Sequence, residues 1–120
     1  MIYKLPDVTP SQNVWDRMHW SAKHRLRDEW FWKVLWRCGK KDAKQVKMRV
    51  KITRVSKRLL DEQNLSAGMK PLLDALVEYG HIYQDSPQWC EFICDQKYCA
   101  ADEEPHMIVQ ISVKRRSPDR

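Results

Sequence analysis

Four charged side chains in the second half of the chain have types and spacings that suit metal chemistry. Asp61 stands where an extended segment meets the expected start of a helix, and Asp85 stands in the loop that follows this helix. Lys70 and Asp74 are four residues apart, so they share one helix face, opposite the leucine-rich face. Clustered carboxylate oxygens are the ligands that Mg²⁺ prefers, with water and substrate phosphate completing its octahedron. A lysine beside them would neutralise a phosphate or a developing leaving-group charge.

The same residues also have a purely structural interpretation. A lysine and an aspartate at i,i+4 commonly form a solvated helix face. Asp61 or Asn64 could serve only as a helix cap, because both residue types accept hydrogen bonds from the first turn of a helix. Spacing alone leaves the metal site and this structural alternative open.

Charge is distributed unevenly along the chain. Residues 17–58 contain 15 Lys/Arg and 3 Asp/Glu, whereas residues 59–106 contain 2 Lys/Arg and 10 Asp/Glu. The basic half would concentrate a phosphate polyanion such as DNA. The acidic half would repel DNA unless it held a cation, which again suits a divalent metal.

A basic and aromatic run near the start of the basic half is a candidate DNA-binding segment. Its members are Arg17, His19, Trp20, Lys23, Arg25 and Arg27. Arginine and lysine would hold phosphates, and Trp20 would stack on an exposed base near a branch point. Trp20 could equally belong to the core, and His19 could be either a phosphate donor or a helix cap.

Hydrophobic periodicity predicts one domain over residues 1–120, of the mixed α/β (α+β) class with the order β-α-β-α-β-β. Strands are expected at residues 2–5, 46–53, 89–96 and 107–113, and two main helices at residues 22–38 and 65–79. Gly68 and Pro71 predict an irregular start to the second helix. Seven of nine positions from Trp30 to Cys38 are apolar, so the first helix is expected to be sandwiched or to form a subunit interface.

The four cysteines raise a question of zinc binding. Cys90, Cys94, Cys99 and His106 carry suitable ligand atoms, but on a strand Cys90 and Cys94 would lie ~13 Å apart. We therefore expect thiols in a reducing cytosol. The first ten residues lack a signal-peptide pattern and no apolar run reaches bilayer length, so we expect a cytoplasmic protein that does not bind membranes.

Three short motifs follow one another in the acidic half: LDEQNL at 60–65, KPLLDAL at 70–76 and QDS at 84–86. In order and spacing they resemble the RusA family of Holliday junction resolvases of phages and prophages, whose pattern is Asp-x-Asp-Asn-Leu, Lys-Pro-x-x-Asp-Ala-Leu and Asp-Asp-Ser. The opening of the chain fits as well, with LP at 5–6, PSQN at 10–13 and RMHW at 17–20. The resemblance spans roughly residues 5 to 113.

This resemblance implies a RusA-like nuclease domain that forms a homodimer and resolves four-way branched DNA during recombination and repair, in a bacterial or phage-infected cell. It implies catalytic roles for Asp61, Lys70, Asp74 and Asp85. The three aspartates would bind Mg²⁺, for which Mn²⁺ could substitute, and Gln63 could add a carbonyl ligand.

Two departures from the family pattern bear on activity. Gln63 and Gln84 are amides where the family has carboxylates, so each removes a negative charge from the expected metal site. The resemblance nevertheless implies a crossover junction endodeoxyribonuclease. The alternative is a protein of the same fold that binds branched DNA but is catalytically weakened or inactive.

Overall fold

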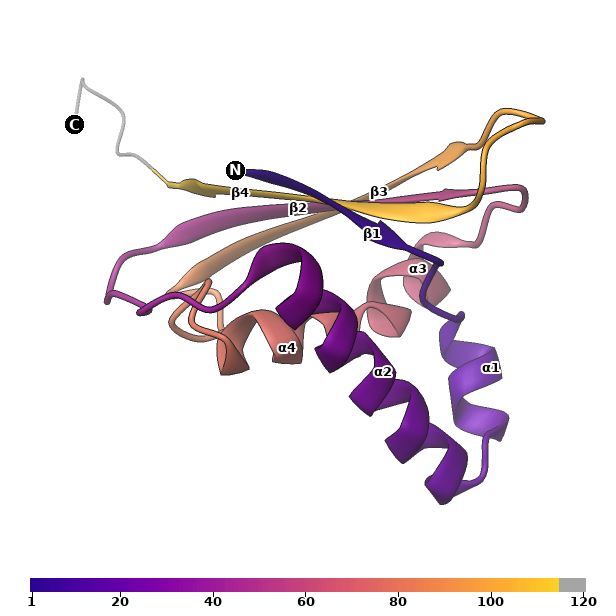
Figure 1. Ribbon diagram of the computed structural model, residues 1–120, viewed down its shortest axis with the longest axis horizontal. Helices are drawn as coiled ribbons and strands as arrows, with labels where there is room; N and C mark the ends of the chain where they lie inside the picture. The colour runs from indigo at the N-terminus through magenta and orange to yellow at the C-terminus, as the bar shows by residue number, and fades with distance from the viewer. Residues whose placement is uncertain (115–120) are drawn as a thin grey trace.

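A four-stranded mixed β-sheet lies at the centre of the computed structural model, which describes residues 1–114 (Figure 1). Its strands are, in spatial order, β1 (Ile2–Pro6), β4 (His106–Val113), β2 (Met48–Ser56) and β3 (Cys90–Tyr98). β2 and β3 are parallel, and β4 runs antiparallel to both β1 and β2. Parallel neighbours need a crossover connection, which the helical segment between β2 and β3 supplies.

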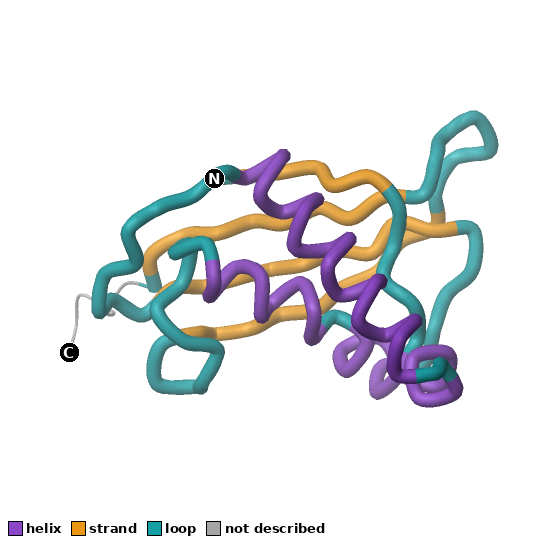
Figure 2. The backbone as a smooth tube through the Cα atoms, turned by 60° about the horizontal axis from the view of Figure 1, so that its bottom comes forward, coloured by secondary structure: helices purple, strands orange, loops and turns teal. Residues whose placement is uncertain are grey.

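Four helical segments lie on one side of this sheet: α1 (Gln12–Arg17), α2 (Trp20–Cys38), α3 (Glu62–Gly68) and α4 (Lys70–Glu78). α2 and α4 contact each other and cover the sheet, whereas α1 and α3 pair beside one end of it (Figure 2). The described residues place no helix on the opposite face of the sheet.

The core forms where α2 and α4 meet the covered face of the sheet. Its largest fully buried side chain is that of Trp30 on α2, which packs with Val34 of the same helix. The other elements contribute Leu5, Val50, Ile52, Leu72, Leu76, Met107 and Val109. Burial of this apolar surface is the main driving force for the fold, and it fixes the orientation of α4.

The structure confirms the mixed α+β class but corrects the predicted element order. Residues 12–17, for which the sequence predicted no helix, form α1, because the Ser11 side chain caps it by accepting a hydrogen bond from the Val14 backbone. α2 begins at Trp20 instead of residue 22, with Nδ1 of His19 accepting from the Ser21 backbone. With α3 and α4 counted as one interrupted helix, the order is β-α-α-β-α-β-β.

The second predicted helix is divided, as Gly68 and Pro71 indicated. α3 ends at Gly68, and α4 begins one residue after Met69 with Pro71 in its first turn, where a missing N–H costs nothing. α3 also starts earlier than expected, because its cap is Asp61 and not Asn64. The break at Met69 turns α4 so that its leucines face the sheet.

Aromatic residues of α2 are only partly hidden. Trp30 is fully buried and Phe31 packs edge-on against Tyr79. Trp32 and Trp36 remain 61% and 79% exposed. The helix is therefore not sandwiched between layers within the described residues, and its part in a subunit interface stays a prediction.

All four cysteines are free thiols: Cys38 and Cys90 are buried, and Cys94 and Cys99 are partly buried. Burial raises the pKa of Cys38 to about 11 and also raises the pKa values of Cys90 and Cys94. Thiols with raised pKa values are poor nucleophiles and poor metal ligands at neutral pH. Across residues 1–114, no helix combines the length and the apolar character needed to cross a bilayer.

Buried His81 should make the fold acid-sensitive. Its Nε2 lies 2.8 Å from the Gly39 carbonyl oxygen, and burial lowers the pKa of His81 below its usual 6.5. The unfolded chain therefore takes up this proton first, so the stability from His81 is present above pH 6.5 and is lost as the pH falls through the lower folded pKa.

We expect His81→Gln, which can keep a donor without titrating, to flatten the fall in melting temperature between about pH 7 and pH 5. His24→Gln, at an exposed position on α2, is the control and should keep the parental slope. Equal slopes for His81→Gln and the parent would show that this histidine does not set the acid limit.

Candidate functional site

Lys70 joins two of the predicted catalytic aspartates. Its Nζ donates to Oδ2 of Asp85 at 2.5 Å and to Oδ1 of Asp74 at 3.0 Å. Lys70 and Asp74 come from the first turns of α4, and Asp85 comes from the loop between α4 and β3. The three residues, called the Lys70 triad below, thus come together from two segments, whereas the sequence predicted that Asp61 would join them.

The triad fixes the charge state of its lysine. The hydrogen bonds that Lys70 donates to Asp85 and then to Asp74 raise the pKa of Lys70 above its usual value. Lys70 is therefore a cation at every physiological pH and cannot act as a general base. Its side chain is 60% exposed, against 29% for Asp74 and 35% for Asp85, so all three remain open to an incoming substrate.

Asp61 is placed differently from the other two aspartates. Its Oδ1 accepts from the Asn64 backbone at 2.8 Å, and its Oδ2 accepts from Nδ2 of Asn64 at 3.1 Å. Oδ1 thus caps the first turn of α3, which is the structural role that the sequence left open, and Oδ2 orients the Asn64 side-chain amide. The structure shows no contact between Asp61 and the triad within the described residues.

Gln63, expected as a possible carbonyl ligand beside Asp61, lies within α3. An extended strand would place the side chains of Asp61 and Gln63 on one face, but residues 62–64 are helical. Side chains two apart on a helix point in nearly opposite directions. Gln63 is exposed on α3, and Gln84 is exposed beside Asp85.

A cleft beside the triad joins it to the basic segment. Its volume is about 440 Å³, and it lies between α1, α2 and the junction of α3 with α4. The lining residues are Gln12, Trp15, Arg27, Ala67, Lys70, Pro71 and Asp74. The cleft therefore contains members of both predicted groups: Arg27, expected to bind DNA, and Lys70 and Asp74, expected to be catalytic.

Close backbone packing holds this cleft together. A Cβ on Gly68 would overlap the Pro10 carbonyl, so only glycine lets the chain before α1 approach α3 this closely. The Asn13 backbone N–H also donates to Oδ1 of Asn64 at 3.2 Å. Asp61 thus contributes indirectly, because it orients the asparagine that ties α1 to α3.

The predicted DNA-binding residues do not form one patch. Lys23 and Arg27 share a face of α2, and the Arg27 guanidinium lies 4.2 Å from the centre of the Phe31 ring. Arg25, two residues from each, points to the other side of the helix. Arg17 ends α1 and is exposed.

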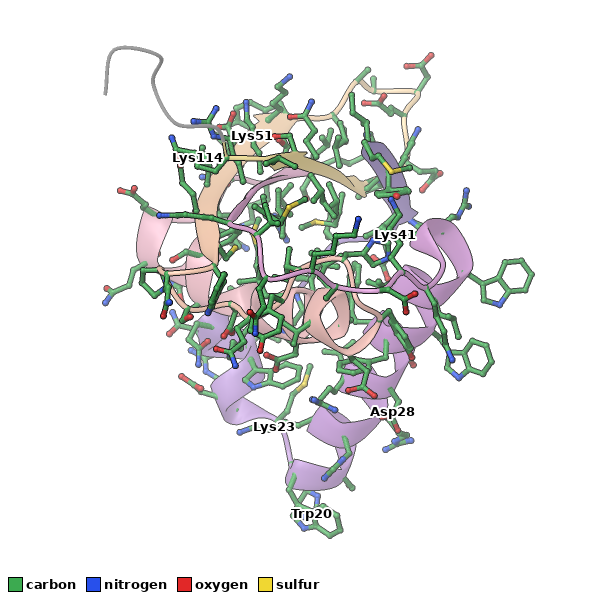
Figure 3. The ribbon with its side chains drawn as sticks, turned by 90° about the vertical axis from the view of Figure 1, so that its left-hand side faces the viewer. Trp20, Lys23, Asp28, Lys41, Lys51 and Lys114 are labelled. Carbon is green, nitrogen blue, oxygen red and sulfur yellow. The ribbon has the colours of Figure 1, made fainter. Side chains whose placement is uncertain are left out.

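Trp20 is not a core residue. It is 68% exposed and projects, next to the capping residue His19, from the end of α2 farthest from the sheet (Figure 3). Together with Lys23 it lies on the side of the molecule away from Lys51 and Lys114, which belong to the sheet. A stacking role for Trp20 therefore remains sterically open.

Sequence reasoning missed Trp15 and Gln12, because it predicted no helix before residue 22. The signal that could have found them is Ser11, a good N-cap residue that predicts a helical turn with Trp15 one turn later. On that turn Gln12 and Trp15 fall three apart and share a face.

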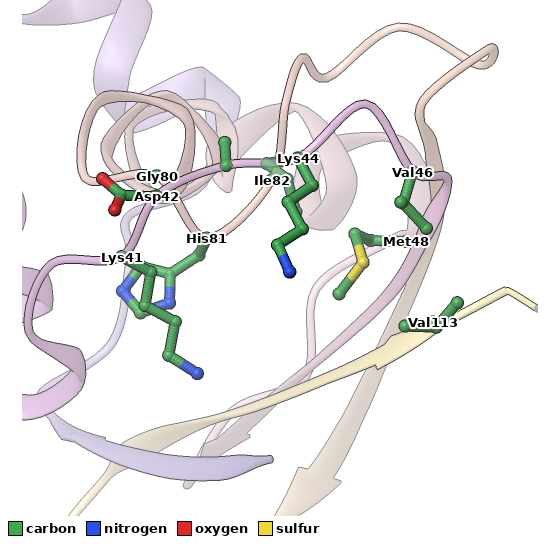
Figure 4. A pocket seen from close by; sticks show the side chains of 10 residues that line it. Lys41, Asp42, Lys44, Val46, Met48, Gly80, His81, Ile82 and Val113 are labelled. Atoms are coloured by element: carbon green, nitrogen blue, oxygen red, sulfur yellow. The ribbon is translucent and has the colours of Figure 1, made fainter.

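A second hollow, of about 190 Å³, lies at the other end of α4 and contains none of the predicted residues (Figure 4). Val46, Met48, Ile82 and Val113 form its apolar wall, and Lys41 and Lys44 stand at its edge. Its lining includes the carboxylate of Asp42 but none of the aspartates of the Lys70 triad.

The carboxylates of Asp74 and Asp85 fit a divalent metal ion only in part. Asp74 and Asp85 both contact one ammonium group, so their oxygens can surround a single cation. Among residues 1–114, however, no three His, Cys, Asp or Glu side chains gather in a way that could hold a metal ion. The residues fit an ion bound by two carboxylates, water and phosphate, and Asp61 as a third ligand stays a prediction.

No family model matches the chain, and no curated protein is similar enough to count as a relative. Assignment of a function therefore depends on the residues and on the geometry of the triad and the cleft.

Proposed function

We propose that this protein is a RusA-like, Mg²⁺-dependent endodeoxyribonuclease that resolves four-way DNA junctions in recombination and repair. The observation that carries the proposal is the cleft in which Arg27 of the basic helix faces Lys70 and Asp74. A phosphodiester that enters this cleft meets cations that bind it and carboxylates that can hold a metal ion beside it. The order of the three sequence motifs supports the same activity.

The residues divide the work between binding and charge stabilisation. Arg27 holds the phosphate backbone, since a guanidinium binds phosphate oxygens in a fork. Lys70, always protonated, stabilises charge that develops on the phosphate or the leaving oxygen. Asp74 and Asp85 hold Mg²⁺, which when bound supplies Lewis-acid activation of phosphate and water. Asp61 positions α3 and, through Asn64, α1.

The direct test measures strand cleavage of a synthetic four-way junction with Mg²⁺, with Mn²⁺ and with chelator. We expect paired nicks near the branch with either metal, little action on linear duplex of the same sequence, and no cutting in chelator. Tight junction binding without cutting in either metal would reject the enzyme and favour the second candidate.

That second candidate is a protein that binds junctions without cutting them. It is favoured by Gln63 and Gln84, which replace carboxylates, and by the ammonium of Lys70, which already neutralises Asp74 and Asp85. Such a protein would show the same preference for branched over linear DNA. Only the metal-dependent step separates the two candidates.

A homodimer would suit this substrate, because two sites related by a two-fold axis match the symmetry of a four-way junction. The surface we assign to the dimer is the outer side of α2, where Trp32 and Trp36 are exposed one turn apart. Aromatic side chains are enriched in the buried centres of such interfaces.

We expect light scattering to give the mass of a dimer at micromolar concentration. A double variant, Trp32→Ser with Trp36→Ser, should be a monomer with its fold retained, since both rings protrude from the domain. Trp20→Ser removes an equally exposed tryptophan outside this surface and should stay dimeric. A monomeric parent would contradict the assignment.

A further inference from the structure

The cleft beside the Lys70 triad, called the triad cleft below, has the size and lining of a ligand site and not of a flat DNA-binding surface. Its volume of about 440 Å³ falls in the range of pockets that enclose small organic groups. One wall is apolar, formed by the half-buried Trp15 ring with Ala67 and Pro71. The other is polar, with Arg27 and Lys70 as its cations.

The position of the Arg27 guanidinium suits it to bind an anion in the cleft. Its guanidinium lies 4.2 Å from the centre of the Phe31 ring, and stacking on an aromatic face leaves the in-plane N–H donors at the edge of the group. Those donors suit the oxygens of a phosphate.

An aromatic wall next to a phosphate-binding cation matches the chemistry of one nucleotide. Nucleobases stack on aromatic side chains with little dependence on sequence. Bases inside a duplex are covered on both faces, so a base reaches such a wall only after it leaves the stack. A branch point is where DNA gives up stacking most readily.

We propose that the cleft holds a single unstacked nucleotide of branched DNA, with its base on the Trp15 ring and a phosphate on Arg27. This assignment rests on the proposed function for its choice of DNA as the substrate. It adds the feature that selects branched over linear DNA: linear duplex offers no free base to the cleft. The Gln12 side-chain amide donates to Oδ1 of Asp16 at 2.6 Å, which leaves its carbonyl oxygen to accept from a base N–H.

The test is a thermodynamic cycle between Trp15 and the base it would hold, measured as junction binding in chelator so that cleavage plays no part. The DNA series contains symmetric four-way junctions with abasic residues at one pair of equivalent positions beside the branch. At the correct position, the abasic junction should bind the parent more weakly by about 5- to 150-fold for each of the two stacked bases removed, the usual worth of one stacked base. Trp15→Leu should lose the same factor on the intact junction and nothing more on the abasic one.

Control variants distinguish a loss of base stacking from a loss of folding. Trp15→Phe keeps a ring and should restore most of the binding, and Val14→Ala, an exposed neighbour on α1, should bind as the parent does. Melting temperatures show whether each variant is folded; if Trp15→Leu is not, the abasic series with the parent and Trp15→Phe still decides the outcome.

Three results would overturn the proposal: no abasic position that weakens parental binding, multiplicative losses from Trp15→Leu and the abasic residue, or displacement of the junction by micromolar deoxyadenosine monophosphate. The last would make the cleft a site for free nucleotides. Failure of the proposed nuclease is a separate result, because it appears as absent cutting with this cycle intact.

Discussion

Junction cleavage should fall by about 100-fold or more when Asp85 is replaced by asparagine, the usual scale for the loss of one electrostatic group from an active site. Asparagine keeps the shape of the side chain and can still accept a hydrogen bond from Lys70. The variant should therefore stay folded while losing one negative oxygen ligand. Junction binding should be unchanged or tighter, because one charge that repels phosphate is gone.

The measurement compares single-turnover cleavage in Mg²⁺ with a mobility-shift titration in chelator. Asp95→Asn is the matched control: Asp95 also pairs with a lysine, Lys51 at 3.9 Å, but on β3 and away from the cleft. It should cut and bind as the parent does. If Asp85→Asn cuts at the parental rate, Asp85 is not part of the active site and the triad is only structural.

The elements with strong periodicity could be predicted from the sequence, and the capped termini could not. Val50 and Ile52 alternate with Arg49 and Lys51, and this pattern correctly identified the central strand. The start of α3 was placed wrongly because Asp61 and Asn64 are both competent caps, and their hydrogen-bond partners decide between them. Local sequence does not contain that information.

The residues of the candidate site likewise divide into those that local sequence predicts and those that it does not. An i,i+4 spacing is a property of the helix itself, so the pairing of Lys70 with Asp74 followed from the sequence. The approach of Asp85 was expected from its loop, although the contact with Lys70 depends on how that loop packs. Trp15 was missed because its position in the cleft depends on the close approach of Pro10 to Gly68, residues 58 positions apart in the chain.

The acidic residues in the second half of the chain lie in two different settings, which a count of charges along the sequence could not distinguish. Glu91 on β3 pairs with Arg49 and with Lys114, so part of the acidic excess neutralises basic strands on the open face of the sheet. Asp74 and Asp85 instead surround Lys70 beside the cleft. Such exposed ion pairs contribute little to stability.

Replacing Lys70 with methionine should have two opposite effects, one on catalysis and one on metal binding. Cleavage should fall by about 100- to 1000-fold, because the cation that stabilises developing charge is lost. Asp74 and Asp85 would then face each other without a counter-charge, and a divalent ion relieves that repulsion. Mg²⁺ should therefore raise the melting temperature of Lys70→Met more than that of the parent, in which the ammonium already occupies the space between the carboxylates.

Thermal melts over a Mg²⁺ titration, without DNA, make this measurement independent of activity. Lys51→Met is the matched control, since it removes a lysine from the longer ion pair with Asp95 on the sheet; its response to Mg²⁺ should equal that of the parent. Lys70→Met combined with Asp85→Asn should lose the added response, because only one carboxylate remains. An equal Mg²⁺ response in parent and Lys70→Met would show that Asp74 and Asp85 do not form the metal site, and the junction-binding candidate would then be the better account of this protein.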